Sequence, residues 1–294
     1  MTFVAGRVKS SAVLAAFLVC SCGAARAQSV PTAIFTDPLP DKAHPAKMTV
    51  VHIPTHGLLI NGVVYQASGA GLHPTIVICH GLPGNEKNLD LAQAVRRAGW
   101  NAVTFNYRGS WGSPGNFRFT QNPEDAAAVL EYLRAPSEAA ALGIDTRRIV
   151  LAGHSMGGWV TALTASKDTG LAGAILISAA DMGQAMGTRE RLVATMADDM
   201  ESLAGVTAQS MADEVMANAK AFSIGNAAPG LAKLPLLVIT SDDGLAPVGA
   251  ALAKAIEAQG GKNVKTVHFA TDHSYSDHRI ALESEVLQWL AGLK

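Results

Sequence analysis

Residues 148–159 read RIVLAGHSMGGW, an apolar run that leads through Gly-x-Ser-x-Gly into a segment with helical periodicity. A serine on a tight turn between a strand and a helix is held in strained backbone geometry, and glycines two residues before and two residues after it leave room for neighbouring chain. Ser155 is therefore predicted to stand above the edge of a sheet, near the amide donors at the amino end of a helix. In this context the motif predicts a nucleophilic serine.

Short apolar runs alternate with helical periodicity on both sides of this motif. Strands are predicted at residues 48–53, 58–66, 75–79, 101–106, 148–152, 173–178, 235–240 and 264–269, and helices at 88–98, 123–133, 155–167, 247–258 and 280–290. The first two strands indicate an antiparallel hairpin with its turn at 54–57, whereas the later runs are typical of buried parallel strands with crossover helices. The pattern predicts an α/β fold with a mostly parallel eight-stranded sheet and helices on both faces. Asn122, followed by Pro123 and two acidic residues, is predicted to cap a helix.

The composition of the 294 residues is that of a globular protein, with 49% hydrophobic and 16% charged residues. This apolar content is enough for a large core, and it excludes the disordered and fibrous classes. The formal net charge is −1, and no stretch of the chain concentrates like charges. Because a protein that binds the phosphate backbone needs a basic face, nucleic acid is not expected as a partner.

The amino-terminal residues differ from the rest of the chain. Arg7 and Lys9 precede an apolar run at 12–20, and residues 25–27, Ala-Arg-Ala, offer small residues at the two positions that a signal peptidase reads. Residues 1–27 are therefore predicted to be a secretory signal, followed by a lead-in at 28–47 and one domain at 48–294. The apolar run is shorter than the ~20 residues that span a bilayer as a helix. We expect an exported protein without stable membrane insertion.

Cysteine usage leaves one alternative for the amino-terminal segment. Cys20 and Cys22 fall within the predicted signal, so Cys79 alone would remain in the mature chain and no intramolecular disulfide could form. The alternative is a lipoprotein cleavage site, in which Cys22 is lipidated and anchors the protein to a membrane. The Ala-Arg-Ala sequence is the better match to a cleavage site.

A second motif lies upstream of Ser155, at residues 76–84, IVICHGLPG. A strand here runs into a turn in which the backbone amide of Leu82 could pair with that of Met156. Two such fixed donors would form an oxyanion hole for the charge that develops when a serine attacks a carbonyl group. His80 is interpreted as a structural residue that shapes this turn.

With these motifs the chain resembles the α/β hydrolases from residue 75 to the carboxyl end, with the preceding hairpin as the first two strands. The resemblance implies a catalytic triad in the chain order Ser, acid, His. Residues 236–247, LLVITSDDGLAP, resemble the loop that carries the acid, which commonly lies four residues before a proline. That spacing selects Asp243, and the adjacent Asp242 is the alternative.

The same resemblance implies a base a few residues beyond the last strand. Residues 270–279 read ATDHSYSDHR, in which His273 is the match and His278, next to the terminal helix, is the alternative. A rival interpretation takes Asp272, His273, Asp277 and His278 as metal ligands. The sequence has no His-Glu-x-x-His helix and, after the signal, no cysteine pair, and the serine interpretation accounts for the same histidine together with two other motifs. No metal site is therefore expected.

Two further segments are predicted to surround the site. Residues 106–115, NYRGSWGSPG, resemble the Arg-Gly loop of peptidase-like and esterase-like relatives, in which Arg108 would brace the site and Trp111 would line the mouth of the pocket. Residues 179–234 hold six of the nine methionines and interrupt the alternation of strands and helices, which predicts a small helical cap. Because methionine surfaces adapt to varied ligands, Met186 and Met200 are predicted to line an apolar substrate pocket. The alternative for Trp111 is that it anchors the loop, and the alternative for the methionines is that they fill gaps between packed helices.

Together with the predicted signal, the resemblance implies an exported serine hydrolase that needs no cofactor, with carboxylic esters as the first choice of substrate. Ser155 would attack the carbonyl group, His273 would move the proton, Asp243 would orient the imidazole, and water would release the acyl group. The second choice is a peptidase of the acyl-aminoacyl or proline-directed kind, with a short peptide as substrate. A third is a binding protein on a hydrolase scaffold, against which the intact serine, acid and base argue.

Overall fold

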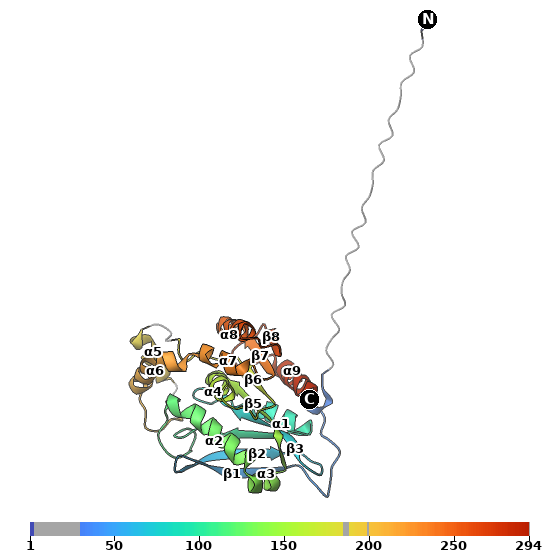
Figure 1. Ribbon diagram of the computed structural model, residues 1–294, viewed down its shortest axis with the longest axis vertical. Helices are drawn as coiled ribbons and strands as arrows, with labels where there is room; N and C mark the ends of the chain where they lie inside the picture. Colours follow the sequence, from blue (N-terminus) through green and yellow to red (C-terminus); the bar gives the residue numbers. More distant parts are fainter. Residues whose placement is uncertain (3–29, 185–187, 199, 294) are drawn as a thin grey trace.

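A mixed sheet of eight strands forms the centre of the computed structural model, which describes residues 1–2, 30–184, 188–198 and 200–293 (Figure 1). The strands are β1 (Lys47–Thr55), β2 (Leu58–Gln66), β3 (His73–Cys79), β4 (Asn101–Phe105), β5 (Ile144–His154), β6 (Gly173–Ile177), β7 (Leu236–Ser241) and β8 (Val264–Phe269), in the spatial order β1-β2-β4-β3-β5-β6-β7-β8. β2 is antiparallel to β1 and to β4, and the other neighbours are parallel. The mostly parallel eight-stranded sheet is confirmed. The signal predicted at 1–27 lies outside the described residues, except for Met1 and Thr2.

Helices cover both faces of the sheet because consecutive residues of a strand point to opposite sides. Ile76 and Ile78 of β3 belong to a core with α1 (Leu89–Arg97) and α9 (Arg279–Gly292), whereas Val77 and Cys79 belong to a core with α2 (Asn122–Arg134), α4 (Met156–Ala165) and α8 (Ala246–Ala258). Strands that are buried on both faces read as continuous apolar runs. Shorter elements are α3 (Pro136–Leu142) and the 3-10 turns η1 (Thr32–Ile34) and η2 (Phe119–Gln121). Within the described ranges, no helix has the length and apolar character that crossing a bilayer requires.

A helical insertion interrupts the alternation between β6 and β7. It contains α5 (Arg189–Ala197), α6 (Ala208–Phe222), the 3-10 turn η3 (Ile224–Ala227) and α7 (Ala228–Leu231). α5 and α6 contact each other and lie together at one end of the molecule (Figure 1). α6 begins at a capping box, in which Thr207 and Ser210 each accept a hydrogen bond from the other's backbone N–H through their hydroxyls. The helical insertion expected at 179–234 is thus present, and we call its described residues the cap.

Asn122 is not the cap of α2, contrary to the prediction. The 3-10 turn before it already brings the backbone of Gln121 into helical conformation, so that α2 continues from that turn and Asn122 lies inside the first helical turn. The Asn122 side-chain amide contacts the Met156 sulfur at 3.5 Å instead. The hairpin turn is also shorter than predicted. Pro54 and Thr55 stay paired with β2, and the turn consists of residues 56–57, both with positive φ.

Candidate active site

Ser155 occupies the turn between β5 and α4 in a strained conformation, with φ 58° and ψ −121°. Its N–H donates to the Ile177 carbonyl of β6 at 2.9 Å. A Cβ on Gly153 would lie 2.0 Å from the Gly157 carbonyl oxygen, and a Cβ on Gly157 would lie 2.1 Å from the carbonyl oxygen of Cys79. Both glycines are therefore required for this turn, which sets the half-buried serine at the carboxyl edge of the sheet.

Asp243 and His273 form a hydrogen-bonded pair at the same edge of the sheet. His273 Nδ1 donates to Asp243 Oδ2 at 2.7 Å, and Asp243 Oδ1 accepts from the Leu245 N–H at 2.8 Å. The Asp243 side chain is only 3% exposed, whereas that of His273 is 40% exposed. Burial by itself would raise the pKa of Asp243, but hydrogen bonds from His273, the Leu245 amide and the hydroxyls of Ser178 and Ser241 hold that pKa below its usual value. Asp243 is thus a carboxylate at neutral pH, held against one ring nitrogen of His273.

His154 connects this pair to the serine turn. Its Nε2 donates to the backbone carbonyl of His273 at 2.8 Å, and the two imidazole rings lie 4.6 Å apart. Burial, with the neighbouring His273, lowers the pKa of His154 to about 4. A neutral imidazole immediately before Ser155 therefore holds the loop that carries His273.

The alternative acid and base residues make other contacts. Asp242 lies 3.0 Å from His268, in an exposed pair. His278 lies 2.8 Å from Asp277, which in turn accepts from the Thr271 hydroxyl. Of the four residues in the rival metal interpretation, His273 is thus paired with Asp243 and His278 with Asp277. Across the described parts of the chain, no three His, Cys, Asp or Glu side chains are grouped so that they could hold a metal ion.

The turn after β3 brings the Leu82 segment beside the serine. A Cβ on Gly81 would lie 3.1 Å from the Ser155 Cβ, so the backbone here passes close to the hydroxyl-bearing side chain. Met156 is the first residue of α4, and its N–H is one of the helix-start amides without a partner inside the helix. His80 is buried, with Nδ1 donating to the Gly81 carbonyl at 2.7 Å, and burial lowers its pKa to about 4. A neutral His80 shapes the turn.

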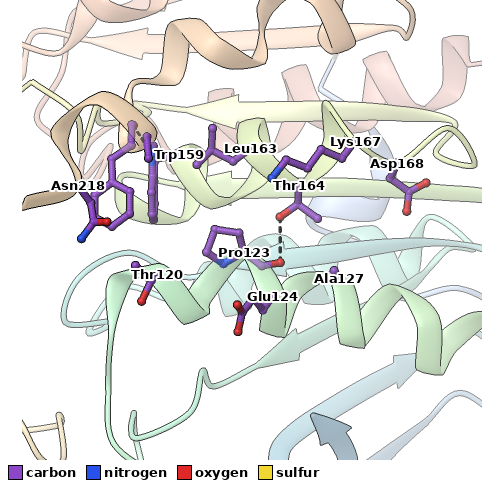
Figure 2. A pocket seen from close by; sticks show the side chains of 12 residues that line it. Thr120, Pro123, Glu124, Ala127, Trp159, Leu163, Thr164, Lys167, Asp168 and Asn218 are labelled. Atoms are coloured by element: carbon purple, nitrogen blue, oxygen red, sulfur yellow. Dashed lines mark hydrogen bonds between the residues drawn. The ribbon is translucent and has the colours of Figure 1, made fainter. Parts of the chain in front are cut away.

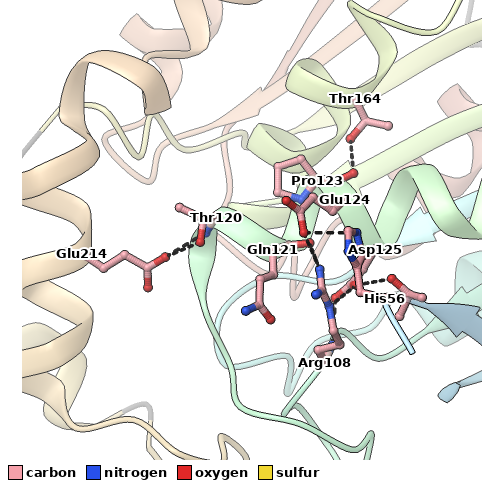
Figure 3. Close-up of polar contacts among 10 residues, drawn as sticks. His56, Arg108, Thr120, Gln121, Pro123, Glu124, Asp125, Thr164 and Glu214 are labelled. Atoms are coloured by element: carbon pink, nitrogen blue, oxygen red, sulfur yellow. Dashed lines mark hydrogen bonds and ion pairs between the residues drawn. The ribbon is translucent and has the colours of Figure 1, made fainter. Parts of the chain in front are cut away.

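Arg108 joins the loop after β4 to α2 (Figure 3). Its guanidinium donates to Asp125 at 2.6 Å and to Glu124 at 2.7 Å, and its backbone N–H donates to the other oxygen of Asp125. The Thr55 hydroxyl of β1 donates to the same fully buried Asp125 at 3.0 Å. Because its charge is matched by two carboxylates, Arg108 braces the loop on the scaffold.

Trp111 meets the cap beside the turn after β3. Its Nε1 donates to the Pro83 carbonyl at 2.6 Å, its backbone N–H donates to the Ser202 carbonyl at 2.9 Å, and Lys87 Nζ lies 4.2 Å from the ring centroid. A cavity of about 540 Å³ adjoins this junction, and it is lined by Pro83, Asn85, Trp111, Gly112, Asp198, Glu201, Ser202, Leu203 and Ala204. Met200 is half-buried and packs against the main core. Met186 lies outside the described residues.

A second cavity, of about 500 Å³, lies between α2, α4 and α6 (Figure 2). Trp159 of α4 and Phe222 of α6 border it, and Trp159 Nε1 donates to the Phe222 carbonyl at 2.6 Å. Pro123 of α2 and Leu163 of α4 also line it. The walls of this cavity are the sides of helices, whereas Ser155, Asp243 and His273 lie in turns at the carboxyl ends of strands.

His154 and the hydroxyl groups of Ser178, Ser241 and Tyr275 were not predicted from the sequence as parts of the site. His154 lies inside the serine motif, but nothing in the motif indicates that its ring reaches the carbonyl of a residue more than a hundred positions later. Ser178 and Ser241 do carry a signal, because Ser178 ends the strand predicted at 173–178 and Ser241 directly follows the strand predicted at 235–240. Polar residues at the carboxyl ends of neighbouring parallel strands meet at one edge of the sheet.

The amino-acid sequence of this chain is similar to those of known proteins. A family model described as "Alpha/beta hydrolase family" matches residues 76–283. An uncharacterized protein of Mycobacterium tuberculosis is 30% identical over 114 residues, which are 38% of this chain and 39% of that protein. The match to this curated relative thus spans about two fifths of its length.

Solved structures share the fold over most of the chain. A thermostable carboxylesterase cloned from a metagenomic library is similar over 90% of this chain and 92% of its own, with a TM-score of 0.63 and 23% identity. The acylaminoacyl peptidase of Pyrococcus horikoshii is similar over 84% of this chain and 42% of its own, with a TM-score of 0.63 and 18% identity. At such identities the likeness shows the fold alone.

Proposed function

Because this chain is a member of the α/β-hydrolase family, we propose that it is a serine hydrolase that cleaves carboxylic esters through an acyl-enzyme intermediate. The observation that carries the proposal is the 2.7 Å hydrogen bond between the buried Asp243 and His273, beside the strained Ser155 turn. A serine hydroxyl needs a base to become a nucleophile, and the base needs a group that orients it. These three residues supply that set of roles.

The proposed reaction follows from which ring nitrogen of His273 is already hydrogen-bonded. His273 Nδ1 is taken by Asp243, so Nε2 is the ring nitrogen that accepts the Ser155 proton as Oγ bonds the substrate carbonyl carbon. Asp243 stabilises the resulting imidazolium, and the backbone amides of Leu82 and Met156 donate to the oxyanion. His273 then gives the proton to the departing alcohol, which leaves the acyl group on Ser155. A water molecule, deprotonated by His273, attacks the acyl carbon, and Ser155 takes the proton back as the carboxylic acid leaves.

The substrate proposal is a small ester that enters between the cap and the turn after β3. The cavity of about 540 Å³ beside Trp111 lies at that junction and is within the usual size range of small-molecule sites. Its walls include the apolar side chains of Pro83, Trp111 and Leu203. Carboxylic esters therefore remain our first choice, ahead of acyl-aminoacyl or proline-containing peptides.

The test compares wild-type protein with Ser155→Ala, using a fluorophosphonate probe, p-nitrophenyl esters of graded chain length and aminoacyl-nitroanilides. Ser155→Ala should lose labelling and turnover, with a nearly unchanged Tm, because one oxygen is removed at the surface of the turn. Ser137→Ala, at an exposed serine of α3, is the matched control. Ester cleavage that survives in Ser155→Ala contradicts the mechanism. Faster anilide cleavage identifies a peptidase, and a wild-type protein that is not labelled points to a binding protein.

Export is part of the proposal and rests on residues 1–27. Cleavage after Ala27 would release the mature enzyme, whereas lipidation of Cys22 would anchor it to a membrane. Intact mass and amino-terminal sequencing of the protein expressed from its full reading frame distinguish the two. A mature chain that begins at Gln28 supports the signal, an acylated Cys22 supports the anchor, and an unprocessed chain in the cytoplasm contradicts both.

A further inference from the structure

Three buried hydroxyl groups adjoin Asp243, and we call Ser178, Ser241 and Tyr275 the hydroxyl cluster. Ser178 Oγ lies 3.0 Å from Ser241 Oγ and 2.9 Å from the Tyr275 phenolic oxygen. None of the three residues is more than 1% exposed. Because a buried polar group that loses its partner is costly, such a network holds its members in one arrangement.

The members of the hydroxyl cluster come from the ends of three neighbouring strands. Ser178 follows β6 directly, Ser241 is the last residue of β7, and Tyr275 lies in the loop after β8. Ser241 stands two residues before Asp243, and Tyr275 stands two residues after His273. The cluster therefore joins the loop that carries the proposed acid to the loop that carries the proposed base.

The cluster also contacts the acid itself. The hydroxyls of Ser178 and Ser241 are near enough to the Asp243 carboxylate to help hold its pKa below the usual value. Burial raises the pKa of Tyr275 to about 12, so its phenol keeps the proton and can donate to the serine hydroxyls. Since hydrogen bonds to an ionised acceptor are the strong ones, the hydroxyl protons are drawn toward the carboxylate.

Backbone strain coincides with this cluster. The φ angle is 41° at Ser178 and 58° at Tyr275, in the left-handed region that non-glycine residues rarely adopt. Such conformations persist only where the surrounding structure holds them, and they are concentrated at functional sites. Ser155, with φ 58°, belongs to the same strained set. The fold thus maintains unfavourable backbone conformations at three residues around the Asp243–His273 pair.

We propose that the hydroxyl cluster fixes Asp243 and His273 relative to each other and shares the negative charge of the carboxylate. Its members are then positioning residues, which act on the reaction through the acid and the base. This inference rests on the proposed function, because it assigns the cluster a role in that same site. The cluster limits how much charge Asp243 presents to the His273 imidazolium, and it keeps the carboxylate in place when the proton moves.

The charged and titratable groups that face this cluster are few. Within the described residues, Asp243 and Arg279 act on the pKa of Tyr275, His273 bonds Asp243, and Asp243 acts on the pKa of His154. The charge of Arg279 is matched by Asp90 at 2.6 Å. The carboxylate and the imidazole are therefore the pair whose proton balance a missing hydroxyl would change.

The test measures Tyr275→Phe and Ser241→Ala beside wild-type protein. Each variant removes one hydroxyl from the cluster and leaves more charge on Asp243, which stabilises the imidazolium. The acid limb of the kcat/KM profile and the NMR titration midpoint of the His273 imidazole should therefore move to higher pH by roughly half a unit. We expect kcat to fall roughly tenfold, because small misplacements of catalytic groups are costly, and KM to stay unchanged.

Two further variants sharpen the experiment. Tyr132→Phe removes a hydroxyl from α2, where Glu138 and burial raise the pKa of the tyrosine, and should leave both pH profiles and kcat unchanged. The double variant Ser241→Ala/Tyr275→Phe should shift the midpoint no further than the larger single change, as expected of groups that act as a unit. If Tyr275→Phe does not fold, the titration midpoint of Ser241→Ala decides the test.

The outcomes separate this inference from the function on which it rests. The NMR titration reads His273 without a substrate, so it applies even to a wild-type protein that cleaves no ester. A wild-type protein that the fluorophosphonate probe does not label contradicts the proposed function. An unchanged titration midpoint in the folded variants, with only a lower Tm, overturns the positioning role and leaves the cluster as a packing feature.

Discussion

At the scale of single residues, the site depends on which of two adjacent aspartates bonds His273. Asp243 and Asp242 are neighbours in the chain, yet only Asp243 turns inward to His273, while Asp242 pairs with His268 at the surface. The difference is one of burial, since the Asp243 side chain is 3% exposed and that of Asp242 is 63% exposed. A buried carboxylate with several donors is the better partner for an imidazolium.

Paired substitutions test this assignment. Asp243→Asn should lower kcat by about 10⁴-fold, because the amide favours the wrong tautomer of His273, whereas Asp242→Asn should change it little. His273→Ala should lower kcat by about 10⁶-fold, on the pattern of triad deletions, whereas His278→Ala should leave most of the activity. Rates of p-nitrophenyl ester cleavage and of fluorophosphonate labelling give the comparison. Reversed results within either pair would move the role to the neighbouring candidate.

At the scale of elements, the five predicted helices match to within two residues at each end, whereas the strands match less evenly, since β5 begins at Ile144 and not at the predicted residue 148. β2 and β8 have the predicted bounds, because an apolar run limited by turn residues marks both ends of a strand. α3 was not predicted, since its seven residues, PSEAAAL, carry no clear apolar period. Strand ends indicate that Ser178 and Ser241 lie at one edge of the sheet, but nothing in the sequence indicates the hydrogen bonds of the hydroxyl cluster, which join residues 63 and 97 positions apart. Only the folded sheet brings such residues to one edge.

The cap is attached to the loop after β4 by backbone hydrogen bonds. The Ala204 N–H donates to the Gly109 carbonyl at 2.8 Å, and the Phe117 N–H donates to the Ala204 carbonyl at 2.9 Å. Farther along, Glu214 of α6 accepts from the backbone N–H and the hydroxyl of Thr120 at 2.9 Å (Figure 3). These contacts fix the cap against the body on the side of Trp111, so the cavity there has a defined shape.

Changing that cavity should change the preference for acyl chain length. Trp111→Ala enlarges the cavity directly, and Met200→Ala removes a side chain next to the lining residue Glu201. Both should raise the ratio of long-chain to short-chain ester turnover, by roughly fourfold for each additional methylene group that becomes buried. The control is Leu163→Ala, which enlarges the cavity between α2, α4 and α6, and it should lower Tm without changing the ratio. A series of p-nitrophenyl esters measures all three variants. A ratio that changes with Leu163→Ala but not with Trp111→Ala would transfer the acyl site to the other cavity.

At the scale of the whole molecule, three buried titratable groups make stability depend on pH in opposite directions. Burial lowers the pKa of His80 and His154 to about 4. Their folded-state pKa lies below the unfolded value of about 6.5, so stability is lost as pH falls from about 6.5 to about 4. Glu283 of α9 acts the other way, because burial and the Asp90 carboxylate of α1 raise its pKa to about 7.

Glu283→Gln isolates the acidic contribution. Between pH 4.5, the ordinary value for a glutamate, and pH 7 the folded protein holds a proton on Glu283 that the unfolded chain has released, so rising pH favours unfolding. Glutamine keeps the shape and the neutral group, and the two buried histidines are common to both proteins and cancel. The free energy of unfolding of the variant minus that of wild type should therefore rise from pH 4.5 to pH 7, by at most about 3 kcal/mol. Urea unfolding at several pH values measures this difference, with Glu257→Gln, at an exposed glutamate of α8, as the control that should stay flat. A difference that falls with rising pH would mean that Arg279, which lies 2.6 Å from Asp90, keeps Glu283 ionised in the folded protein.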